Sequence, residues 1–155
     1  MADYRVIYIT DTSTGTDDTT GAANGIFLDK RFTVPTDRLW RIENIQVTAI
    51  TAGAVGNREL QLTIDRADAS DTEPYVDIRA GVVQAASLTR YYSFFPEAAR
   101  LTSFADTDWL STPIPDIEIP SGWIVRIFDN AAIGTTAAPD DMDIRMVIQQ
   151  RAAKN

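Results

Sequence analysis

Hydrophobic and polar residues alternate along most of the chain, with the two-residue period of a β-strand that has one buried face. The alternation is cleanest over Arg58–Arg66, where three apolar residues fall on one face. It also runs through Leu39–Thr51, but its phase shifts midway, which predicts a β-bulge near Glu43–Asn44. The other predicted strands are Tyr4–Thr10, Ile26–Val34, Tyr75–Ala80, Val82–Phe95 (one strand or two), Asp116–Pro120, Gly122–Asn130 and Met142–Gln150.

One segment has the composition of a helix. Pro96–Trp109 opens with a proline, which suits a first helical turn, and continues Glu-Ala-Ala-Arg. We therefore expect at most one short helix, near residues 96–104. Many short strands between Thr-, Gly- and Asp-rich connections predict an all-β protein, a two-sheet antiparallel β-sandwich that is jelly-roll-like. An immunoglobulin-like sandwich is the alternative.

The chain divides into three parts. Residues 1–25 hold a strand and an extended Thr/Gly/Asp loop that could serve as an interaction arm, residues 26–150 form the sandwich, and residues 151–155 are a short tail. The last two long strands read as a closing hairpin with an exposed Ala/Gly/Thr tip, and Thr51–Asn57 reads as a second hairpin loop. Two segments, "VPTDRLWRI" and "IPSGWIVRI", each place Arg-Ile six residues after a proline and predict a turn that feeds a strand.

The composition of the chain excludes several classes of catalytic and metal-binding site. The chain has no cysteine and no histidine, so thiol nucleophiles, zinc–thiolate sites and the Ser-His-Asp type of triad are absent. A net charge of −8 argues against direct binding to nucleic acid, and no run is apolar and long enough for a membrane helix. Arginine supplies 12 of the 14 cationic side chains, a bias that is typical of protein interfaces or of a GC-rich genome.

Carboxylates are the remaining candidates for chemistry. "DTSTGTDD" (Asp11–Asp18) resembles a calcium loop, but its glycine is one place early and Ala22 stands where the bidentate glutamate belongs. Pro139–Asp143 holds three aspartates, yet neighbours on a strand point to opposite faces, so Asp140 and Asp141 do not form a catalytic pair. We interpret this segment as a solvated turn, and we expect no enzyme activity, metal or cofactor.

Aromatic residues cluster in "TRYYSFFPE" (Thr89–Glu97). On a strand, Tyr91 and Tyr92 would point to opposite faces, one to the core and one outward. An outward aromatic surface would suit a protein interface or the stacking of a sugar. A glycan-binding jelly-roll module is therefore one alternative function.

Several motifs together resemble a group of small virion proteins of tailed bacteriophages. They are a Val-Pro turn into Trp-Arg-Ile (Val34–Ile42), a Val-Gly-Asn-Arg hairpin (Val55–Arg58), a Pro-x-Gly turn into an arginine-containing strand (Pro120–Ile127) and Asp-Asp-Met at the last strand (Asp140–Met142). The likeness covers residues 32 to 149. Thr36-Asp37 departs from the small residue and glycine expected in the first turn.

The resemblance implies a jelly-roll capsid decoration (cement) protein. It would bind the major capsid protein on the exterior of the virion as a homo-oligomer, a trimer at the three-fold positions of the lattice. A head–tail adaptor or minor tail protein is the alternative within the same group. The residues expected at such contacts are Asp11, Thr14, Asp17, Asp18, Arg31, Arg58, Tyr91, Tyr92, Asp140 and Asp141.

Overall fold

The structure is a computed structural model, and the residues that it describes are 4–11, 29–51, 53, 58–66, 74–104, 108–129 and 140–153. This part of the chain is all-β and forms a sandwich of two sheets, which confirms the predicted fold class. The strands are β1 (Arg5–Asp11), β2 (Asp29–Thr33), β3 (Arg38–Ile50), β4 (Leu60–Asp65), β5 (Val76–Arg79), β6 (Thr89–Phe95), β7 (Trp109–Pro113), β8 (Glu118–Ile119), β9 (Ile124–Asp129) and β10 (Asp141–Ala152).

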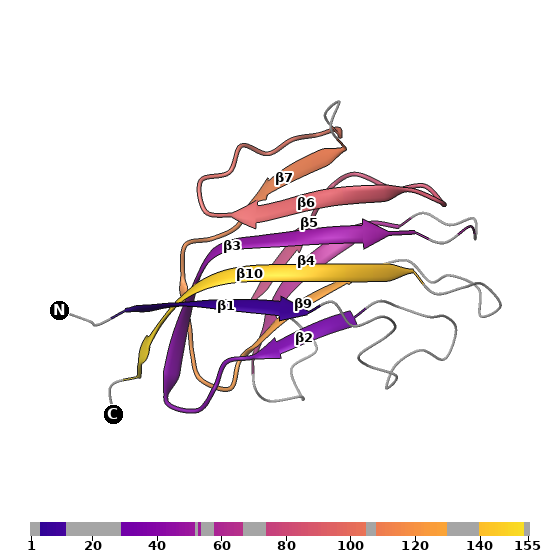
Figure 1. Ribbon diagram of the computed structural model, residues 1–155. Coiled ribbons are helices and arrows are strands. Elements are labelled where there is room, and N and C mark those ends of the chain that lie inside the picture. Colours follow the sequence, from indigo (N-terminus) through magenta and orange to yellow (C-terminus); the bar gives the residue numbers. More distant parts are fainter. Residues whose placement is uncertain are drawn as a thin grey trace.

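The strands pair in a nested order. One sheet runs β1-β10-β3-β6-β7, with β8 also paired to β3, and the other runs β2-β9-β4-β5 (Figure 1). Four antiparallel pairs are nested in the sequence, so that each pair lies between the two strands of the pair before it. They are β1·β10, β2·β9, β3·β6 and β4·β5. A long folded ribbon rolled into two layers has this pairing, and it is the arrangement of a jelly roll.

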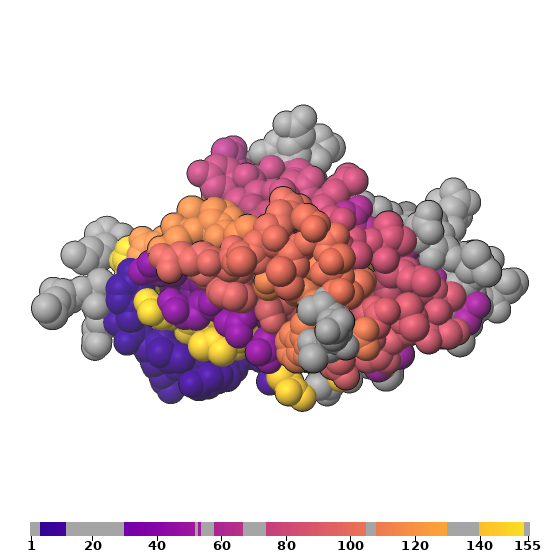
Figure 2. Space-filling view, turned by 90° about the horizontal axis from the view of Figure 1, so that it is seen from above, coloured from indigo at the N-terminus to yellow at the C-terminus, as the bar shows by residue number. Residues whose placement is uncertain are grey.

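The two long strands at the end of the sequence do not form a hairpin. Strand β9 lies in the four-stranded sheet and β10 in the six-stranded sheet, and β3 and β4 are divided in the same way, so both predicted hairpins are wrong. Figure 2 shows the two layers edge-on, with indigo β1 on one side and the magenta residues of β4 and β5 on the other. The expectation that β9 and β10 line one core is confirmed, because Ile127 and Ile144 are both fully buried.

The predicted bulge is present in β3. Val147 of β10 pairs with Asn44 and the next residue, Ile148, pairs with Ile42, so Glu43 is the extra residue. The bulge resets the phase of the alternation, and both halves of the strand then turn their apolar side chains inward.

Residues 96–104, the described part of the segment after β6, are not helical. Glu97 has a φ of 64°, in the left-handed region, which ends regular right-handed structure directly after Pro96. The segment is the crossover that carries the chain to β7, and β7 pairs parallel to β6. A parallel pair needs a long connection, and residues 96–108 supply it. This is the departure from a wholly antiparallel sandwich.

The two proline-led turns have one geometry. In each, an N–H three residues on bonds back to the proline carbonyl, from Arg38 to Pro35 at 3.2 Å and from Trp123 to Pro120 at 3.2 Å. The third residue of each turn has a positive φ, 60° at Asp37 and 79° at Gly122. The turns also bond to each other, since Gly122 N–H donates to the Val34 carbonyl at 2.9 Å. The predicted turn into a strand is confirmed in both places.

Candidate functional site

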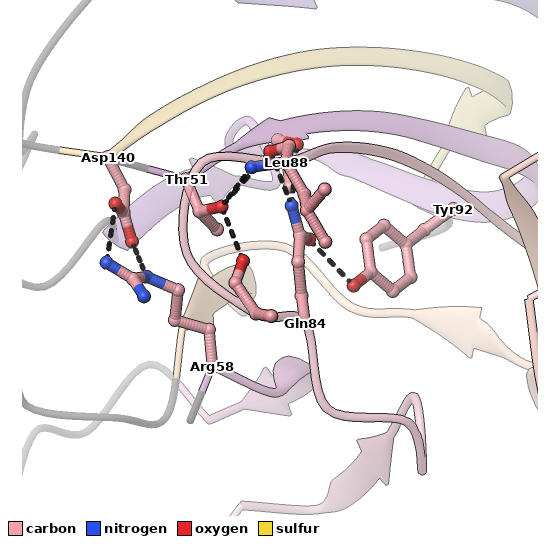
Figure 3. A network of polar contacts seen from close by, with 8 residues as sticks. Thr51, Arg58, Gln84, Leu88, Tyr92 and Asp140 are labelled. Atoms are coloured by element: carbon pink, nitrogen blue, oxygen red, sulfur yellow. Dashed lines mark hydrogen bonds and ion pairs between the residues drawn. The ribbon is translucent and has the colours of Figure 1, made fainter. Parts of the chain in front are cut away.

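A buried ion pair joins the start of β10 to the residues before β4. The guanidinium of Arg58 donates from Nε and Nη2 to the two carboxylate oxygens of Asp140, the second bond at 3.2 Å (Figure 3). Both side chains are only 3% exposed. A bidentate Arg–carboxylate pair fixes orientation as well as distance, so the pair holds the two sheets together where the chain crosses between them.

Gln84 extends this polar region toward β6. Its amide nitrogen donates to the carbonyls of Leu88 at 2.9 Å and Ala49 at 3.1 Å, and its amide oxygen accepts from the Tyr92 hydroxyl at 3.0 Å (Figure 3). The backbone of Gln84 and that of Arg58 also form a bridge. Burial, more than any nearby charge, raises the pKa of Tyr92 above its ordinary value of 10, so the hydroxyl stays protonated and donates.

Thr51 anchors the same segment on its other side. Its hydroxyl donates to the Ala85 carbonyl at 2.7 Å and accepts from the Leu88 N–H at 3.0 Å. The connection between β5 and β6 is thereby tied to the end of β3. Buried polar groups with complete sets of partners make one packing arrangement specific.

The space beside this network is too small for a substrate. A cavity of about 20 Å³ lies among Thr51, Arg58, Gln84, Tyr92 and Asp140. That volume accommodates about one water molecule. The buried groups lie in positions that join strands, and we assign them a structural role.

This arrangement corrects the interpretation of the closing aspartates. Asp140 is not part of a solvated turn but is 3% exposed and bonded to Arg58. Asp141 is half-buried, and its carboxylate accepts from the Met142 N–H at 2.9 Å, a local bond at the start of β10. Neither Arg58 nor Asp140 is open to a partner, so both leave the set of surface contacts.

Two of the remaining predicted contact residues lie at strand positions. Asp11, at the end of β1, accepts a hydrogen bond from the fully buried Lys30 Nζ at 3.3 Å and so ties β1 to β2 of the other sheet. Arg31 is exposed on β2, opposite Arg126 of β9. The predictions at Thr14, Asp17 and Asp18 lie outside the described residues.

The solvent face of the six-stranded sheet carries an aromatic pair. Tyr91 of β6 stacks on Trp109 of β7, with ring centroids 5.0 Å apart and planes 23° apart. Trp109 is 40% exposed, whereas Tyr92 is 1% exposed and belongs to the core. The sequence alternation left the choice between the two tyrosines open, and Tyr91 is the outward one.

A hollow lies beside the aromatic pair. It has a volume of about 150 Å³ and is lined by Tyr91 and Trp109 together with side chains from β3 and β10, namely Gln46, Thr48, Asp143 and Arg145. These strands face the reader in Figure 1. The alternation of β10 places Asp143 and Arg145 outward and was readable from the sequence. Trp109 was missed because its segment was interpreted as helical.

A third polar cluster joins the two ends of the chain to β8. Glu118 accepts from Arg151 Nε at 2.7 Å, from Arg151 Nη2 at 2.6 Å and from the Tyr4 hydroxyl at 2.6 Å. These bonds, from Arg151 first and Tyr4 second, lower the pKa of Glu118 to about 2. The cluster lies at the surface, and its hydrogen bonds hold β8 against β10 and the residue before β1.

Within the described residues, no three acidic side chains gather in the way that a metal ion requires. The same residues contain no helix long and apolar enough to cross a membrane. Comparison with protein-family models and with curated protein sequences finds no match to this chain.

Proposed function

We propose that this chain is a non-enzymatic structural protein of a tailed-bacteriophage particle, which binds the capsid surface and stabilises the head. The observation that carries the proposal is the apolar solvent face of β1. Val6 is 51% exposed and Tyr8 is 77% exposed, and both point away from the core on a strand at the edge of its sheet. A stripe of apolar side chains left in solvent is typical of a surface that another protein covers.

The edge position of β1 adds a second kind of contact. In the described part of the chain, β10 is the strand paired with β1, and no strand pairs with its other side. A strand edge presents a row of backbone donors and acceptors that can extend into a neighbouring sheet. Side-chain burial and backbone pairing could therefore act together at β1.

The remaining support comes from the resemblance to phage virion proteins and from the jelly-roll fold. A decoration protein must fold before assembly and then bind a repeated lattice, and a net charge of −8 opposes self-association before that step. The partner we propose is the major capsid protein, with a homo-oligomer, a trimer, at the lattice three-fold positions. The proposed location is the exterior of the virion.

The direct test mixes purified protein with expanded, undecorated capsids and measures co-sedimentation. We expect binding at micromolar protein, and we expect the double variant Val6→Ser/Tyr8→Ser to weaken it at least tenfold. The matched control is Val83→Ser, which alters a side chain that is 52% exposed between β5 and β6. Protein that stays in the supernatant with all capsid preparations would refute decoration.

Copy number distinguishes the head from the tail. A decoration protein occupies every equivalent lattice position, whereas an adaptor or minor tail protein is limited to one or a few rings. Quantitative mass spectrometry of purified virions measures the ratio to the major capsid protein. A ratio near that of a single ring would replace decoration with the adaptor role.

A further inference from the structure

We propose that the hollow beside Tyr91 and Trp109 is a binding site for a neutral hexopyranose sugar. The proposal is independent of capsid binding, because the site lies on β3, β6, β7 and β10 and does not include the apolar face of β1. It would give the protein a second ligand on the solvent face of the six-stranded sheet. A glycan on a cell surface is the source of sugar that such an outward site could reach.

The aromatic side of the hollow suits the apolar face of a sugar ring. Tyr91 and Trp109 are neighbours in the parallel pair β6·β7, so their side chains leave the sheet on the same face. Their stacking, with centroids 5.0 Å apart, fixes both rings before any ligand arrives. Rigid aromatic surface binds C–H groups at a small cost in side-chain entropy.

The polar side of the hollow suits hydroxyl groups. Asp143 and Arg145 alternate with buried residues of β10, and Thr48 and Gln46 lie directly opposite them in the ladder with β3. The carboxylate accepts hydrogen bonds, the guanidinium donates them, and the amide does both. A sugar ring carries donors and acceptors around its rim, and this set can satisfy both kinds.

The two charged side chains of the hollow, Asp143 and Arg145, also form no ion pair with the described residues. Arg41, Arg58, Arg90 and Arg151 each bond to a carboxylate of this chain. The structure gives neither Asp143 nor Arg145 such a bond to the described residues. Two opposite charges on one side of a hollow leave little net charge, which favours a neutral polyhydroxylated ligand over an anion or a cation.

The size of the hollow limits the ligand to one ring. A volume of about 150 Å³ is below the range of drug-sized pockets and comparable with a single monosaccharide. An open site with one ring stacked and a few hydrogen bonds supports a dissociation constant of about 1 mM for a monosaccharide. Many copies on one particle would raise the apparent affinity for a glycan-coated surface.

The test titrates the free, full-length protein with methyl glycosides of glucose, galactose, mannose and N-acetylglucosamine, each to 50 mM. The readout is the assigned two-dimensional NMR spectrum. We expect the Trp109 indole N–H and the amides of Tyr91, Thr48 and Asp143 to shift with at least one glycoside. Absence of any shift at these positions with all four sugars would overturn the proposal.

Variants then locate the binding. Trp109→Ala and Asp143→Ala are each expected to weaken the affinity at least fivefold, while Tyr8→Ala is expected to leave it unchanged. Tyr8 is the matched control, because it is a more exposed aromatic residue on the same face of the same sheet. Thermal unfolding establishes that each variant is folded. Equal affinity in wild type and Trp109→Ala, or loss in Tyr8→Ala, would contradict this site.

Discussion

At the scale of single residues, the polar side chains of this protein divide into those that hold the fold and those that face solvent. Arg58, Asp140 and Gln84 are buried and have partners from distant parts of the sequence. No local pattern reveals such a pair, because Arg58 and Asp140 are 82 positions apart and each follows a stretch of mostly small residues that is typical of a loop. Asp143 and Arg145 were predictable as outward residues, since they alternate with the apolar residues of β10.

Replacing one member of the buried ion pair should be costly. We expect Arg58→Met or Asp140→Leu alone to lower the free energy of unfolding by about 3 kcal/mol, because each leaves a buried charge without its partner. The double variant should lose much less than the sum, since no unpaired charge remains. Urea unfolding of all four proteins measures the coupling.

The surface pair Arg41–Asp116 provides the control. Its side chains are 39% and 46% exposed, so Asp116→Ala should lower the free energy of unfolding far less than either variant of the buried pair. A loss of stability in Arg58→Met or Asp140→Leu as small as the loss in Asp116→Ala would show that the buried pair does not hold the fold together.

Glu118 should make part of the stability depend on pH. Its pKa in the folded protein is about 2, below the ordinary value of 4.5, because Arg151 and Tyr4 donate to the ionised form. The contribution is therefore complete above about pH 4.5 and is lost as the pH falls toward 2. Wild type should exceed Glu118→Gln in stability by a constant amount near neutrality, and the difference should shrink over that acidic window. Chemical unfolding at a series of pH values would show a constant difference if the bonds to Glu118 were unimportant.

At the scale of elements, strand alternation predicted most of the sheet but not which strands share a layer. The period of two places a side chain inward or outward and says nothing of the pairing partner. For that reason the β9 and β10 segments looked like a hairpin although they lie in different sheets. Strand β7 was missed because its five residues, "WLSTP", follow a helix-like composition and gain their strand conformation from pairing with β6.

The third position of the two proline-led turns is glycine in one turn and aspartate in the other, and substitutions there should have opposite effects on stability. Gly122→Ala should destabilise by about 1 kcal/mol, because a Cβ is unfavourable at a φ of 79°. Asp37→Gly should stabilise by about 0.5 kcal/mol, since φ is 60° there. Thermal unfolding of both variants measures the two signs. Equal effects of the same sign would mean that the positive φ is not what distinguishes these positions.

The structure places β1 within the sandwich as well as at its surface. Ile7 and Ile9 pack against the core, and β1 pairs with β10 from Arg5 to Asp11. Deleting residues 1–11 should therefore lower the free energy of unfolding by roughly 2 kcal/mol or more and expose the edge of β10 to self-association. Light scattering and urea unfolding measure both effects. A truncated protein of unchanged stability and a monomeric state would show that β1 is a separable arm.

At the scale of the whole molecule, the nested pairing makes the fold depend on contacts between distant parts of the chain. Proteins of this kind fold slowly, in milliseconds to seconds, because loop closure precedes the gain from pairing. We expect refolding from urea to show a time constant in that range, followed by stopped-flow tryptophan fluorescence with the buried Trp40 as a reporter. Refolding within microseconds would indicate a core that forms from local contacts.

The nested order also determines when each strand pair can form during synthesis of the chain. The innermost pair, β4·β5, has both of its strands by residue 79, whereas β2 must wait for β9 and β1 must wait for β10, which ends at residue 152. Among the described strands, the first to be made, β1, is therefore the one whose partner is made last. During that interval the apolar faces of β1, β2 and β3 are not yet covered by the completed opposite sheet. The sandwich is therefore complete only after β10 has been synthesised, and the strands made before it depend on dilution or on chaperones until then.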